Sequence, residues 1–199
     1  MKIVTWRGVR DLKAAKLLTD TTEKIEFDAV RDLAGISKLT KNTETSSETK
    51  FYNNSPAVII QGNGTDEVAI DASAVSEENQ AWMTGEYYDV DDDIYIEGSP
   101  DEQYFALGYI TKKSDGSERL IWRLKGSFAY PESEHNTEDD GTDSTGTTIN
   151  YTGVETIHKF AKTGKKAKAV NVGADKYDEE KFFATVQTPD TYTAAKKTT

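Results

Sequence analysis

The sequence has no cysteine and only two histidines among its 199 residues. The absence of cysteine excludes a disulfide framework, thiol catalysis and any metal site with cysteine ligands. No apolar run approaches the length that spans a membrane, and the first eight residues, MKIVTWRG, lack the apolar core of a secretion signal. We therefore expect the chain to be made and folded in the cytoplasm, with no membrane partner.

Positive charge is also scarce. The 24 Lys and Arg residues stand against 35 Asp and Glu residues, which gives a formal net charge of −11 at pH 7. Ordinary nucleic-acid binding requires a basic surface, so this balance argues against it. It does not exclude a surface along which DNA slides without sticking.

Apolar residues make up 36% of the chain and the mean hydropathy is −0.68, so much of the surface must be polar. A chain of this length can still bury a sizeable core. We predict a single domain over residues 1–189 and a flexible C-terminal tail over residues 190–199. The composition suits either a thin sandwich with long loops or a subunit that shares its core with neighbours.

The two histidines, His135 and His158, lie in an acidic loop and in a predicted strand. A histidine–carboxylate pair is possible in the loop, but a solvated loop cannot fix catalytic geometry without support. The sequence contains no glycine-rich phosphate loop, nucleophile elbow or HExxH-type metal motif. We predict no catalytic residue and no cofactor, and the chain is not expected to be an enzyme.

Four aspartates, Asp89, Asp91, Asp92 and Asp93, are dense enough to test as a calcium-binding loop. An EF-hand loop needs glycine at its sixth position and glutamate at its twelfth. Counted from Asp91, these positions hold isoleucine and glutamate, so the motif fails. A chance cation site at this surface, or in the acidic stretch from residue 138 to residue 143, stays open as an alternative, and no metal ligand is predicted.

The strongest structural pattern lies between residues 104 and 130. Two runs rich in β-formers, residues 104–112 and 118–130, flank the tight-turn sequence Ser114-Asp115-Gly116. In the second run, apolar residues alternate with polar ones, which predicts a long, half-buried antiparallel strand. Aromatic residues in such strands stabilise cross-strand pairs, and those predicted for the core are Tyr104, Trp122, Phe128 and Tyr151.

Other segments have simpler patterns. Residues 11–19 fit a helix or a strand, and we favour the strand. Residues 56–60 and 67–70 surround a glycine-rich turn and predict a second hairpin.

Apolar residues at helical spacing predict one short flanking helix from Ser76 to Met83, with Ser76 as N-cap and Gly85 as stop. Residues 147–162 are predicted as a strand, and residues 178–186 as a second short helix or a strand. Trp82, Tyr87 and Tyr88 could form a sugar platform, but core packing is the favoured interpretation.

The segment from Thr40 to Asn54 is almost entirely polar. It is interpreted either as a solvated hairpin loop or as a protruding loop that orders only against another subunit. The acidic, glycine-containing segment from Glu132 to Gly146 is predicted to be a mobile loop.

The stretch YFALGYITKKSDGSERLIWRLKGSFAYPESEHNTEDDGTDSTGTTINYTG, which begins at Tyr104, resembles the signature of the major tail proteins of long-tailed phages, in particular the phi13-type family of Gram-positive bacteria. These proteins have an aromatic strand and turn, a tryptophan strand and an acidic "dGtd" loop before "ytg". The resemblance covers most of residues 8–173. It departs at Asn53 and Asn54, where the family usually has aspartate.

The resemblance implies an antiparallel β-sandwich of the tail-tube type, assembled as hexameric rings that stack into a tube through which DNA passes. The implied location is the virion, and the implied partners are further copies of the chain and the tail-tip initiator, tape-measure and terminator proteins. The residues expected in the loop that bridges rings are Lys41, Glu44, Glu48, Lys50 and Tyr52. The acids expected to line the lumen are Asp89, Asp91, Asp92 and Asp93, which would repel phosphate weakly.

Two other classes remain as alternatives. One is the tube of a related contractile bacteriocin or secretion system, which would share the fold. The other is a carbohydrate- or calcium-binding β-sandwich that uses the aromatic and acidic clusters, and the missing secretion signal counts against it.

Overall fold

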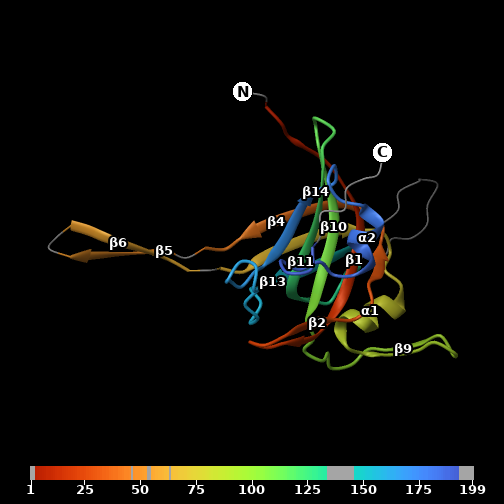
Figure 1. Ribbon diagram of the computed structural model, residues 1–199. Helices are drawn as coiled ribbons and strands as arrows, with labels where there is room; N and C mark the ends of the chain where they lie inside the picture. Colours follow the sequence, from red (N-terminus) through yellow and green to blue (C-terminus); the bar gives the residue numbers. More distant parts are fainter. Residues whose placement is uncertain (1–2, 46, 53–54, 63, 134–145, 193–199) are drawn as a thin grey trace.

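A single antiparallel sheet of ten strands forms the body of the molecule in the computed structural model (Figure 1), which describes residues 3–45, 47–52, 55–62, 64–133 and 146–192. The prediction of a mainly β, antiparallel fold is therefore confirmed. The strands of this sheet are β1 (Trp6–Asp20), β2 (Ile25–Phe27), β3 (Arg31–Ala34), β4 (Ile36–Thr43), β7 (Asp66–Ala72), β10 (Phe105–Lys113), β11 (Glu118–Phe128), β12 (Glu132–Ser133), β13 (Thr147–Gly153) and β14 (Ala169–Gly173). Two separate hairpins are formed by β5 (Ser47–Tyr52) with β6 (Ser55–Gln61) and by β8 (Tyr87–Asp89) with β9 (Ile94–Ile96).

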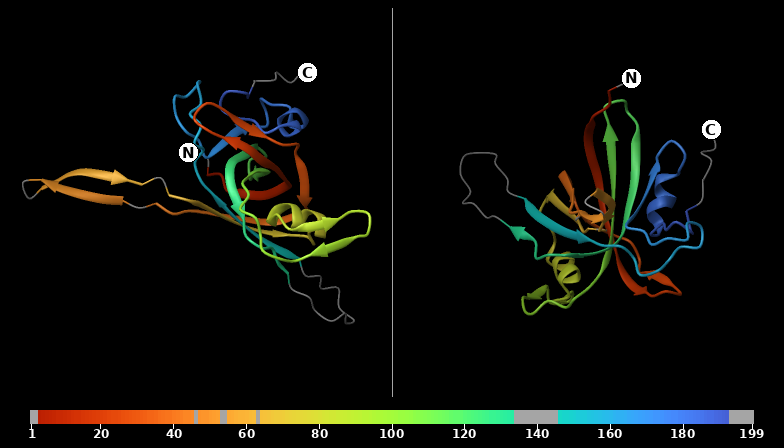
Figure 2. Two further views of the ribbon diagram at one scale, coloured as in Figure 1. Left: turned by 90° about the horizontal axis from the view of Figure 1, so that it is seen from below. Right: turned by 90° about the vertical axis from the view of Figure 1, so that its left-hand side faces the viewer.

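The large sheet closes on itself. Its strand order runs β1-β10-β11-β13-β7-β4, and β1 pairs on its other edge with β3. Only Gly35 separates β3 from β4, so these two strands join the ends of the sheet. The Gly35 amide donates to Ser73 Oγ at 3.0 Å, and the Ser73 amide donates to the Gly35 carbonyl at 2.8 Å. The two layers expected of a sandwich thus belong to one sheet wrapped into a barrel (Figure 2).

The predicted central hairpin is confirmed, since β10 and β11 pair antiparallel from Phe105↔Gly126 to Lys112↔Glu118. Gly116 in the turn has φ +86°, a conformation that glycine adopts without strain. Gly108 is needed for a different reason, because a Cβ there would lie 2.8 Å from the Trp122 ring. The conformation of Gly116 confirms the turn predicted at Ser114-Asp115-Gly116.

The prediction that the second strand of this hairpin is half-buried is wrong. Leu120, Trp122 and Leu124 face an outer core together with β14 and the second helix. Ile121 faces the core inside the barrel, and Arg123, on the same side of the strand, is buried as well. β11 is therefore covered on both faces, because the second helix packs over the outside of the barrel while β14 pairs with the edge of β11.

Two helices are present in the described residues, where one was predicted. Helix α1 (Glu77–Thr84) begins after Ser76, whose side chain accepts from the Asn79 amide, and ends at Gly85 in the left-handed conformation. This confirms the predicted cap and stop. Helix α2 (Glu179–Ala184) resolves the ambiguity of residues 178–186, and it buries Phe182 and Phe183 against the outer core.

Two strand predictions need correction. Residues 56–60 and 67–70 do not form a hairpin with each other: β6 pairs with β5, while β7 pairs with β13 and β4. The glycines between them connect two strands that belong to different sheets. The strand predicted over residues 147–162 ends at Gly153, and an irregular segment follows. The preference for a strand over residues 11–19 is confirmed by β1.

The predicted core aromatics differ in burial. Trp122 and Tyr151 are buried, and each donates a hydrogen bond to a carbonyl: Trp122 Nε1 to Phe182 at 3.1 Å, and Tyr151 Oη to Phe105 at 2.9 Å. Burial raises the pKa of Tyr151. Phe128 is only partly buried and packs against the barrel core.

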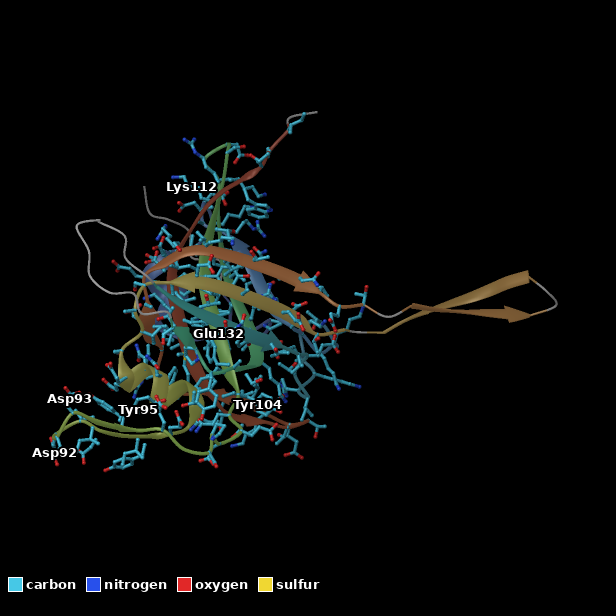
Figure 3. All side chains as sticks on the ribbon, turned by 180° about the vertical axis from the view of Figure 1, so that it is seen from behind. Asp92, Asp93, Tyr95, Tyr104, Lys112 and Glu132 are labelled. Carbon is cyan, nitrogen blue, oxygen red and sulfur yellow. The ribbon has the colours of Figure 1, made fainter. Side chains whose placement is uncertain are left out.

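Tyr104 is not a core residue. Its ring is half-buried under the Lys125 ammonium, 4.9 Å from the ring centre, and its hydroxyl donates to Glu102. It lies just before β10, where the chain enters the sheet (Figure 3).

Candidate functional site

The hairpin β5–β6 projects from the barrel and is the most distinctive surface feature of the molecule (Figure 1). Its two strands pair antiparallel from Ser47↔Gln61 to Tyr52↔Ser55, with a bulge after Lys50, and within the described part of the chain they join no other sheet. An isolated two-stranded hairpin has marginal stability in water. Such a projection gains stability when another surface covers it.

A loop was predicted from Thr40 to Asn54, and that prediction is wrong. The segment contains the end of β4 and all of β5. β-branched threonine favours strands, and pairing with β7 and β6 satisfies the backbone of this polar sequence. The residues expected to bridge rings fall in three places: Lys41 in β4, Glu44 between the strands, and Glu48, Lys50 and Tyr52 in β5. Their role in bridging stays a prediction.

A buried charge cluster fixes the base of this hairpin. Asp66 accepts hydrogen bonds from Arg123 and, at 2.8 Å, from Thr43 Oγ1. Lys41 Nζ and Lys168 Nζ lie 3.7 and 3.9 Å from the same carboxylate. Burial by itself would raise the pKa of Asp66, but the Thr43 hydrogen bond and the positive charges of Arg123 and Lys41 outweigh it and lower the pKa. The carboxylate therefore stays ionised and holds together strands that enter the projecting hairpin.

The second hairpin, β8–β9, carries the acids predicted to line a lumen. The turn between its strands holds Asp91, Asp92 and Asp93, and Asp92 and Asp93 lie at its tip in Figure 3. The Asp89 carboxylate accepts from the Asp91 amide at 3.0 Å, the Asp92 amide at 3.2 Å and the Tyr87 hydroxyl at 3.1 Å. These bonds lower the pKa of Asp89. The structure thus brings the four aspartates together, and their position in a lumen stays a prediction.

Glu86 anchors this hairpin to the body. Its carboxylate accepts hydrogen bonds from Tyr95, from the Gly98 amide at 2.7 Å, from Tyr130 at 2.7 Å and from Thr84 Oγ1 at 2.9 Å. Partial burial would raise its pKa, but these four donors lower the pKa to about 2. Burial, together with the hydrogen bond that Tyr95 donates to Glu86, raises the pKa of Tyr95. No sequence motif identified Glu86, because its donors come from segments up to 44 residues away.

The aromatic residues considered as a sugar platform do not form one flat surface. Trp82 packs edge-on against Phe105 with ring centres 4.8 Å apart, and Arg31 covers its ring. Tyr87 and Tyr88 lie on opposite faces of β8, since neighbouring residues in a strand alternate. This arrangement favours packing over sugar binding.

The histidines and the acidic clusters were the candidates for metal or acid–base chemistry. No group of three or more His, Cys, Asp or Glu side chains among them is placed to hold a metal ion. The ring of His158 packs edge-on against Phe160, and its buried Nδ1 has no hydrogen-bond partner there. His135, most of the acidic loop from Glu132 to Gly146, and the acids of residues 138–143 fall outside the described part of the chain.

A further carboxylate that sequence reasoning missed, Asp20, lies at the end of β1. Asp20 accepts from the Ile157 amide at 2.8 Å, the His158 amide at 2.9 Å and Lys125 Nζ at 2.8 Å. Its burial would raise its pKa, but these donors lower the pKa instead. Asp20 therefore fixes the start of the irregular segment that follows β13.

No helix in the described part of the chain has the length and apolar character needed to cross a membrane. No protein-family model matches this sequence, and a search of curated proteins finds no match.

Proposed function

We propose that this chain is a structural subunit of a phage tail tube, in which hexameric rings stack into a conduit for DNA. The single observation that carries the proposal is the projecting hairpin β5–β6, because a two-stranded element extended into solvent requires a partner surface. In a stack of rings, the neighbouring ring supplies that surface. The initiator, tape-measure and terminator proteins of the tail are the further partners of such a subunit.

The resemblance of residues 104–153 to major tail proteins supports the same function. These residues build β10, β11 and β13, which lie next to one another in the barrel. The similarity therefore extends over three neighbouring strands of the barrel and is not confined to one peripheral motif.

Charge is consistent with a conduit. A net charge of −11 disfavours adhesion of DNA to the subunit, and acids gathered on a projecting hairpin can line a passage that DNA crosses without binding. The aspartates of the β8–β9 turn are the proposed lumen acids.

The test is negative-stain electron microscopy of the concentrated protein, combined with its mass in solution. Six-membered rings or hollow tubes are expected for the full chain. A variant in which residues 47–61 are replaced by a short Gly-Ser turn should keep its cooperative unfolding, because the hairpin projects away from the body (Figure 1), and should form no stacked rings. Tubes of normal length from this variant would remove the hairpin from the proposed mechanism.

A further inference from the structure

Two stretches of the chain each carry charge of one sign only. The sequence has no lysine or arginine between Phe51 and Thr111, and no aspartate or glutamate between Thr156 and Ala174. The first stretch contains the acidic hairpin β8–β9, and the second contains the irregular segment that follows β13. We call the second stretch the basic segment. A chain with two such surfaces is complementary to copies of itself.

The acidic hairpin also presents an apolar face. In its register Tyr87 pairs with Ile96 and Asp89 pairs with Ile94, so these four side chains share one face. Tyr87, Ile94 and Ile96 are 58%, 48% and 55% exposed, and Val90 in the turn is 71% exposed. Apolar groups that are rimmed by acids are typical of a protein interface.

The basic segment has the matching character. Ile157 is 45% exposed, and Lys159, Lys165 and Lys166 of the same segment are exposed as well. None of these three lysines forms an ion pair with any residue that the structure describes. Their charges are therefore available to an incoming surface.

Both surfaces are held in place by buried or hydrogen-bonded carboxylates. Glu86 fixes the base of the acidic hairpin. Asp20 binds the backbone at the start of the basic segment, and Asp190 accepts from the Ala161 and Lys162 amides at 2.9 and 2.8 Å. Surfaces fixed in this way lose little conformational entropy when they bind.

The acidic hairpin and the basic segment lie on opposite sides of the barrel in both views of Figure 2. A contact between two different surfaces on opposite sides of a subunit is heterologous, and it generates a ring or a filament. We propose that the apolar, acidic face of β8–β9 docks on the basic segment of a second copy of this chain. This inference rests on the proposed function, since it supplies the contact between neighbouring subunits within one ring. It assigns Asp91 and Asp92 to that contact in place of the lumen.

A charge-swap experiment tests the contact directly. The first variant, D91K/D92K, reverses two exposed charges whose side chains the fold does not need, and the second, K165E/K166E, reverses their proposed partners. Each variant alone should associate at least about tenfold more weakly than the wild type in sedimentation velocity, because like charges then face each other. An equimolar mixture of the two should regain association, since each altered surface meets a complementary one.

Two controls complete the design. The variant E67K/E132K makes the same change in net charge as D91K/D92K at exposed positions elsewhere, and it should associate like the wild type. Zero-length carbodiimide cross-linking of mixed ¹⁴N- and ¹⁵N-labelled wild-type chains should join Asp91 or Asp92 of one copy to Lys165 or Lys166 of another.

Each outcome separates this contact from the tube proposal. If both charge-swap variants still form normal rings or tubes, the contact is overturned and the proposed function stands. Association through these two surfaces into filaments without a lumen would support the contact and overturn the ring. The contact is also overturned if the mixture fails to regain association, or if the wild type gives no such cross-link at its highest soluble concentration. It is likewise overturned if K165E/K166E loses only binding to duplex DNA.

Discussion

The pairs β10–β11 and β8–β9 are both antiparallel hairpins, yet different forces hold them. β10–β11 is covered on both faces by apolar side chains, and Trp122 at its centre is fully buried. β8–β9 has one face in solvent and is attached mainly through the hydrogen bonds of Glu86. The comparison shows that apolar burial fixes the barrel, while the ionised carboxylate of Glu86 anchors the hairpin β8–β9 that projects from it.

The largest effect is expected where apolar burial dominates. Trp122→Ala removes a fully buried ring and a hydrogen bond to Phe182, and should lower the free energy of unfolding by about 3–5 kcal/mol in chemical denaturation. Trp6→Ala is the matched control, because Trp6 is 65% exposed, and it should stay within about 0.5 kcal/mol of wild type. Equal losses from both variants would contradict the assignment of the core.

The next effect concerns the charge cluster below β5–β6. Asp66→Asn leaves Arg123 buried without its counter-charge, and the expected loss is about 3 kcal/mol. The control lies on the same strand: Asp71→Asn affects an exposed pair with Lys38 and should cost less than about 1 kcal/mol. If the two variants unfold at the same denaturant concentration, the cluster does not stabilise the base of the hairpin.

Glu86 makes stability depend on pH. Its pKa in the folded protein is about 2, below its ordinary value of 4.5, so its contribution is complete above about pH 4.5 and is lost as the pH falls toward 2. Glu86→Gln should cost on the order of 1 kcal/mol at pH 7, reduced by partial solvation, and nothing near pH 2. Urea titrations across this range measure the difference.

The control for Glu86 is Glu97→Gln, an exposed acid beside the same hairpin, which should leave stability within about 0.5 kcal/mol at every pH. A Glu86→Gln penalty that persists unchanged at pH 2 would mean that the carboxylate charge is not what anchors β8–β9.

The smallest effect belongs to the basic segment. Asp190→Ala removes the acceptor of the Ala161 and Lys162 amides and should cost about 0.5–1.5 kcal/mol. Hydrogen exchange of those two amides should accelerate while that of β10 amides stays unchanged. Asp190→Asn keeps one acceptor oxygen and should have an intermediate effect. Unchanged exchange at both amides would show that this carboxylate does not order the segment.

Elements whose signal is local could be predicted from the sequence alone. The turn Ser114-Asp115-Gly116 and the cap at Ser76 depend on neighbours within a few residues, and both were predicted correctly. The alternation of β13, with Ile149 and Tyr151 buried and their neighbours more exposed, was equally readable because one strand face meets the core.

Features that join distant segments became apparent only in the folded molecule, because the fold sets which segments meet. It closed the sheet through Gly35, paired β14 with the edge of β11, placed α2 over the outer face of β11, and paired β6 with β5 instead of β7. It also gave Glu86 and Asp20 donors that lie up to 44 and 138 residues away. Local sequence preferences cannot predict such pairings, because the free energy of a pairing depends on which surfaces the completed fold brings into contact.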